Sequence, residues 1–105
     1  MRVTFESRGG RTEVRLSENP DDFTRIAHLI ENAFSGEWMK KLNGLDQSYW
    51  DYSVTGIMLT LHREHYLGVS LFPATVETDL QRANELVAEI GIHLQSLYDP
   101  GAHLD

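Results

Sequence analysis

Apolar and polar residues alternate in two short runs at the start of the chain, and a period of two is typical of half-buried β-strands. Gly9 and Gly10 lie between the runs and can adopt the positive φ angles that tight hairpin turns require. The sequence therefore predicts a β-hairpin over residues 2–16. Its apolar positions are Val3, Phe5, Val14 and Leu16.

Two longer stretches space their apolar residues by three and four positions, which places these residues along one side of an α-helix. The first helix is expected to begin at Asn19 and Pro20, residues that favour a helix start, and to end near Gly36. The second is expected to end before Pro100. The two apolar stripes are Phe23, Ile26, Ala27, Ile30, Ala33 and Phe34, and then Val76, Leu80, Ala83, Val87, Ile90, Leu94 and Leu97.

Three further alternating runs lie between these helices, and they predict the strands of an antiparallel meander. Turn residues separate the runs at Thr55-Gly56 and at Glu64-His65. A single bent strand over residues 49–63 with a bulge at Gly56 is the alternative for the first two runs. The predicted strands cover residues 49–54, 57–63 and 66–72.

Residues 37–48 show no clear period of two. Trp38, Leu42 and Leu45 are apolar, but the pair Asn43-Gly44 interrupts any long element. We expect a short turn of helix here, followed by a loop.

The predicted order of elements is ββ-α-βββ-α in one domain, residues 1–105. Each helix has one apolar stripe, and the sheet has one apolar face. The simplest way to bury all three is an α+β two-layer sandwich, in which both helices cover one face of an antiparallel sheet of four or five strands. The second face of the sheet would then be open to water or to a partner.

The composition excludes several classes of function. The chain has no cysteine, which excludes disulfides, iron–sulfur clusters and thiol catalysis. Its net charge of −7 repels phosphate backbones but attracts a basic protein surface. No segment has the apolar length of a membrane span, and no apolar signal-peptide run follows Met1. We therefore expect a cytoplasmic protein that binds neither nucleic acid nor membranes.

The run from His62 to His65 is the strongest candidate for catalytic or metal chemistry. A hairpin turn there could bring His62 and His65 together, with Asp51 or Glu64 as a carboxylate ligand, in a two-histidine-one-carboxylate metal site. The spacing differs from His-Glu-x-x-His, and an ordinary solvated turn explains these residues as well. Because no nucleophile elbow or phosphate loop accompanies them, we predict no enzyme, no catalytic residue and no cofactor.

The polar positions of the predicted strands form the candidate binding surface. Tyr and Met beside acidic groups are typical of protein-recognition surfaces, although a solvated sheet face is the alternative. Ser70 belongs to the same face, and Arg2, Glu6, Arg11, Glu13 and Arg15 would extend it with mixed charge. The predicted partner-binding residues are Tyr49, Asp51, Met58, Thr60, His62, Glu64 and Tyr66.

One part of the chain resembles known proteins, namely Trp50-Asp51-Tyr52-Ser53-Val54-Thr55-Gly56 with Leu59-Thr60-Leu61-His62-Arg63-Glu64-His65-Tyr66-Leu67-Gly68-Val69-Ser70. These segments resemble stretches of small bacterial proteins that are similar to immunity proteins, which are encoded beside secreted polymorphic or contact-dependent toxins. The resemblance implies a cytoplasmic antidote that plugs or distorts a basic toxin domain, and it brings no catalytic residues.

The expected function is therefore a non-enzymatic protein-binding module, most specifically a bacterial immunity protein. A small metal-dependent enzyme or ligand-binding protein centred on His62 and His65 is the alternative. A homodimer formed through a strand edge or through Ile92 is a third interpretation.

Overall fold

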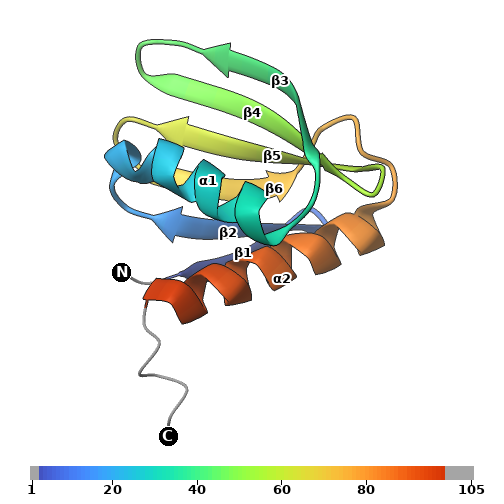
Figure 1. Ribbon diagram of the computed structural model, residues 1–105. Coiled ribbons are helices and arrows are strands. Elements are labelled where there is room, and N and C mark those ends of the chain that lie inside the picture. Colours follow the sequence, from blue (N-terminus) through green and yellow to red (C-terminus); the bar gives the residue numbers. More distant parts are fainter. Residues whose placement is uncertain (1–2, 99–105) are drawn as a thin grey trace, which may run out of the picture.

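Six antiparallel strands form one sheet, and two α-helices pack against it, in the computed structural model, which describes residues 3–98 (Figure 1). The α+β class is confirmed. The order of the strands across the sheet is β1-β2-β6-β5-β4-β3. The strands are β1 (Thr4–Arg8), β2 (Arg11–Ser17), β3 (Glu37–Asn43), β4 (Gln47–Val54), β5 (Ile57–Glu64) and β6 (Gly68–Pro73), and the helices are α1 (Phe23–Ala33), which follows a 3-10 turn at Pro20–Asp22, and α2 (Leu80–Tyr98).

The prediction of four or five strands in the order ββ-α-βββ-α is wrong, because residues 37–48 form strand β3 and the start of β4. Asn43-Gly44 begins the turn of this hairpin. A bulge between Trp38 and Lys40 shifts the register of β3 against β4. Because of the bulge, residues on one face of β3 are three positions apart there instead of two. In addition, this edge strand is mostly exposed. Both features remove the alternation of apolar and polar residues by which a strand is recognised in a sequence.

The other boundaries follow the predictions more closely. Thr55 and Gly56 both have positive φ angles in the two-residue turn between β4 and β5, so residues 49–63 form two strands and not one bent strand. Strand β6 begins at Gly68, two residues later than expected. Helix α2 begins at Leu80, which leaves Val76 outside the helix and exposed. The predicted helix stop at Pro100 and the residue Arg2 lie outside the described residues.

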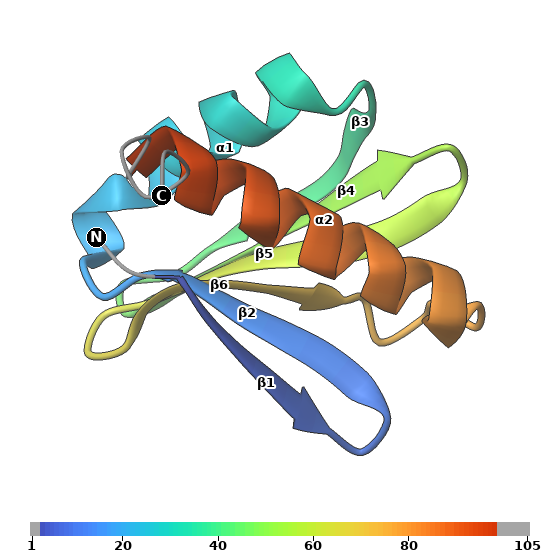
Figure 2. The ribbon, with the colours of Figure 1, turned by 90° about the horizontal axis from the view of Figure 1, so that it is seen from below.

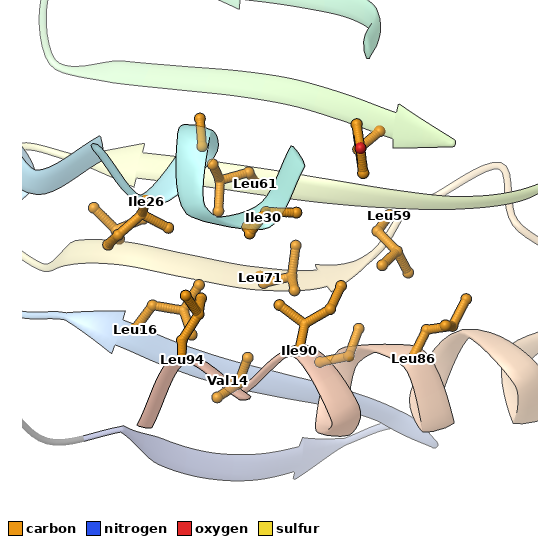
Figure 3. Packing of buried hydrophobic residues seen from close by; sticks show 14 of the residues in the cluster. Val14, Leu16, Ile26, Ile30, Leu59, Leu61, Leu71, Leu86, Ile90 and Leu94 are labelled. Carbon is orange, nitrogen blue, oxygen red and sulfur yellow. The ribbon is translucent and has the colours of Figure 1, made fainter. Parts of the chain in front are cut away.

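Both helices lie on the same side of the sheet, and the core fills the space between the two layers (Figure 2). Within the described residues, no helix combines the length and apolarity that a membrane crossing requires. Apolar side chains of β2, β5 and β6 point toward those of α1 and α2 (Figure 3). The labelled side chains in that view are Val14, Leu16, Leu59, Leu61 and Leu71 of the sheet and Ile26, Ile30, Leu86, Ile90 and Leu94 of the helices.

Candidate functional site on the open face of the sheet

The face of the sheet that the helices leave uncovered, here called the open face, carries six of the seven predicted binding residues. In the register of β4 and β5, Tyr49 lies opposite His62 and Asp51 opposite Thr60. These positions alternate with Tyr52, which is buried on the helix side. Met58 and Glu64 share the same face of β5. Tyr66, the seventh residue, lies in the turn between β5 and β6 and is 82% exposed.

A hollow of about 290 Å³ lies at the centre of the open face. The hollow forms because β6 carries two small residues there, Gly68 and Ser70, between larger side chains of the neighbouring strands. Aromatic rings and charged side chains from the neighbouring strands form its walls. The residues that line it are Arg8, Glu13, Arg15, Tyr49, His62, Glu64, Leu67, Gly68, Ser70 and Phe72.

Two stacked rings form one wall of the hollow. The Tyr49 and His62 rings lie 4.3 Å apart between centroids, with an angle of 12° between their planes. Gln47 holds both rings, since its Oε1 accepts a hydrogen bond from the Tyr49 hydroxyl and lies 3.0 Å from Nε2 of His62. The edge of Phe72 packs against His62 at 5.9 Å between centroids. Contacts within the protein therefore position both rings of this wall.

Burial lowers the pKa of His62, against the opposing effect of the carboxylates of Glu64 and Glu13. The imidazole is consequently neutral near pH 7 and presents an aromatic surface instead of a positive charge. Beside it, the Thr60 hydroxyl donates a hydrogen bond to Oδ1 of Asp51 at 2.6 Å. Thr60 is only 5% exposed, so it supports Asp51 and does not itself present a contact surface.

Charges of both signs surround the hollow without pairing to one another. Among the salt bridges of residues 3–98, none involves Glu13, Arg15 or Glu64. Glu6 also lies directly opposite Glu13 in the β1–β2 register, which is an unfavourable pair of like charges. The guanidinium of Arg8, which lies 3.3 Å from Oε2 of Glu6, offsets part of that repulsion.

Exposed apolar side chains gather at the end of the sheet beside the hollow, where two turns meet. The backbone N–H of His65 donates to the carbonyl of Asp46 at 2.8 Å, which joins the β5–β6 turn to the β3–β4 turn. The Arg63 guanidinium reinforces the junction by donating to the carbonyl of Gly44 at 3.1 Å. We call the exposed side chains of this region the apolar rim; they are Leu42, Leu45, Tyr49, Tyr66 and Leu67.

Sequence reasoning missed most of the apolar rim and also Gln47. Leu42, Leu45 and Gln47 fell in the stretch expected to be helix and loop. Leu67 fell in the strand expected over residues 66–72, where alternation with Tyr66 places it on the core side. Because β6 begins only at Gly68, Leu67 belongs to the turn and is exposed. Extending the period of two backward from Tyr49 would have placed Gln47 on the same face.

The structure does not gather the four residues of the alternative metal site. Asp51 is hydrogen-bonded to Thr60, His62 is held by Tyr49 and Gln47, and His65 packs against the ring of Tyr66. Glu64 is one of the residues that line the hollow. Within residues 3–98, no group of three His, Asp or Glu side chains is arranged to hold a metal ion.

Comparison of the chain with models of known protein families, with curated proteins and with solved structures finds no match.

Proposed function

We propose that this protein is a non-enzymatic protein-binding module that docks a partner on the open face of its sheet. The best-supported partner is a basic toxin domain, which makes the protein a bacterial immunity protein acting in the cytoplasm. The observation that carries the proposal is the combination of a preformed hollow with the apolar rim beside it. Protein interfaces commonly join a buried aromatic and aliphatic centre to a polar surround.

The hollow suits a side chain better than it suits a small substrate. It lies open on the face of the sheet, its walls are both charged and aromatic, and Gln47 contacts both of its stacked residues. A partner residue inserted there would contact Tyr49 and Leu67, while neighbouring partner residues would cover the exposed apolar rim. Because the rings are ordered in the free protein, binding would require little further loss of side-chain entropy.

The charges would contribute to recognition in two ways, by attraction over a long range and by selection at contact. A net charge of −7 attracts a basic partner over distances of about 10 Å at moderate ionic strength. At contact, Glu13, Glu64 and Arg15, which form no salt bridge within the described residues 3–98, select for a partner with a matching pattern of charges. We therefore expect the association rate to fall steeply with added salt, and the dissociation rate to depend on the apolar rim.

Titration calorimetry against the product of a toxin gene adjacent to the one for this protein tests the proposal. Leu67→Asp and Tyr49→Ala should each weaken binding by at least about tenfold, because they remove apolar contacts at the centre of the surface. Ile92→Asp is the matched control, because Ile92 is 60% exposed and Leu67 is 53% exposed, but Ile92 lies on α2. Absence of a heat of binding, or equal weakening by both aspartates, contradicts the proposal.

A growth experiment separates binding from immunity. Cells that express the toxin should survive when they also express the wild-type protein or Ile92→Asp, and should die with Leu67→Asp. Binding in the calorimeter without rescue would retain the binding module and reject the immunity function. Sedimentation at two protein concentrations tests the homodimer; the bulge and the two lysines of the outer strand β3 discourage pairing through that edge.

A further inference from the structure

A second concave site lies on the other side of the sheet, between α1 and the strands β3 and β4. This groove has a volume of about 240 Å³. Strand β3 is one of the two edge strands of the sheet, and it lies at the edge farther from α2 (Figure 1). The groove contains Trp38 and Trp50, which are the two tryptophans of the chain. It does not share a residue with the hollow on the open face.

The two indole rings form adjacent walls of the groove. Their centroids are 5.5 Å apart and their planes meet at 77°. Each ring is supported from behind, since Trp50 contacts the edge of Phe23 and Trp38 packs against Tyr52. The bulge in β3 is what brings Trp38 to this side of the strand together with Lys41, three residues later.

Glu31 of α1 adds a carboxylate to the lining of the groove. The Trp38 indole N–H donates to Oε2 of Glu31 at 2.8 Å, and Nδ1 of His28 lies 2.7 Å from Oε1. The hydrogen bonds from Trp38 and His28 lower the pKa of Glu31 and keep it ionised. Aromatic faces together with a carboxylate are the chemistry that recognises organic cations.

The protein already places one ammonium group in this groove. Nζ of Lys41 lies 4.2 Å from the centroid of the Trp50 ring and 5.7 Å from that of Trp38. The Lys41 side chain is exposed, and within residues 3–98 it forms no salt bridge. Its flexible stem can leave the rings for water at little cost, so the ammonium position is open to exchange.

We propose that the groove formed by Trp38, Trp50 and Glu31 binds an organic ammonium group, and that Lys41 occupies this position in the free protein as an internal competitor. A ligand cation replaces the Lys41 ammonium on the two rings and lies beside the Glu31 carboxylate. The inference stands independently of the proposed docking on the open face.

Titration with tetramethylammonium chloride, followed by tryptophan fluorescence, tests the inference directly because both tryptophans line the groove. Sodium chloride at equal concentration controls for ionic strength. Lys41→Met should bind tetramethylammonium about two- to fivefold more tightly than the wild type, since the competing cation is gone. Lys40→Met is the matched control, because it removes the same charge from the neighbouring position. Lys40 lies opposite Asp51 of the open face in the β3–β4 register, so its removal should leave the affinity unchanged.

Glu31→Gln provides a second test that leaves both indoles in place. It should weaken tetramethylammonium binding at least about twofold in the Lys41→Met background, because it removes the negative charge and keeps a hydrogen-bond acceptor for Trp38. Choline and Nα-acetyl-lysine amide then distinguish a small quaternary ammonium from a lysine side chain as the source of the ammonium. A Lys41→Met protein without a saturable fluorescence change, or one that responds no differently from Lys40→Met, overturns the inference.

Discussion

Tyr49 and His62 stack almost parallel across the β4–β5 pair, with 4.3 Å between ring centroids and 12° between ring planes. The two residues lie directly opposite each other in the strand register. Oε1 of Gln47 contacts both the Tyr49 hydroxyl and Nε2 of His62. The two stacked rings together form one wall of the hollow. It also makes the charge state of His62 a measurable property of the candidate site.

The first prediction concerns the pH dependence of stability. Because burial lowers the pKa of His62 below its usual 6.5, the unfolded chain binds more protons than the folded protein at and below that pH. The stabilisation by neutral His62 is present above pH 6.5 and is lost as the pH falls through the folded pKa. Urea unfolding at pH 7.5 and pH 5.5 should therefore show a larger loss of stability for the wild type than for His62→Gln.

His65→Gln is the control for this experiment, because His65 is an exposed turn residue. It should lose as much stability on acidification as the wild type. If His62→Gln and His65→Gln have the same pH dependence as the wild type, His62 is not the titrating group.

The second prediction concerns two buried tyrosine hydroxyls. Tyr98 Oη is buried and has no hydrogen-bond partner among residues 3–98, and burial raises the pKa of Tyr98 to about 12. Tyr98→Phe removes an unsatisfied polar atom and should raise the free energy of unfolding by about 1 kcal/mol. The matched change Tyr52→Phe should lower it by about 1 kcal/mol, because the Tyr52 hydroxyl donates to the carbonyl of Phe34. Denaturant unfolding of both variants gives the sign of each change.

The third prediction concerns Gly68 at the floor of the hollow. Its φ angle is +101°, and a Cβ atom there would lie 2.1 Å from the carbonyl oxygen of Ser17. Gly68→Ala should therefore cost more than about 3 kcal/mol of stability. Gly10→Ala, with φ of +79° but no atom within 4 Å of the added Cβ, should cost only about 1 kcal/mol. Equal costs in thermal unfolding would show that backbone conformation alone, and not the close approach of β2, requires glycine at position 68.

The fourth prediction concerns the order of the apolar rim. The Arg63 guanidinium contacts both Gly44 and Ser48, and so holds the β3–β4 turn against β5. Arg63→Met keeps an unbranched apolar stem but removes the guanidinium donors, so local opening of the turn should become more frequent. Amide hydrogen exchange should become faster at Gly44 and His65 and stay unchanged in the β1–β2 hairpin. Unchanged exchange at the two turn amides would remove Arg63 from this role.

The periodic parts of the chain predicted most of the fold. The stripes of α1 and α2 and the alternation in β1, β2, β4 and β5 depend only on which side of an element is buried, and a sequence records that directly. The same alternation placed Tyr49, Asp51, Thr60 and His62 on one face before any tertiary contact was known. Strand β3 was missed because an exposed edge strand with a bulge has no apolar period to read.

The sequence by itself determined the α+β class, the two amphipathic helices and the placement of Tyr49, Asp51, Met58, Thr60, His62 and Glu64 on one face, because each follows from local periodicity. Only the tertiary structure decided that Gln47 holds the Tyr49–His62 pair, that Leu42, Leu45 and Leu67 gather at two adjoining turns, and that Lys41 rests on the two tryptophans. These relationships join residues through strand register, bulges and turn packing. A register or a bulge depends on how separate segments fit together in space, and a local pattern does not specify that fit.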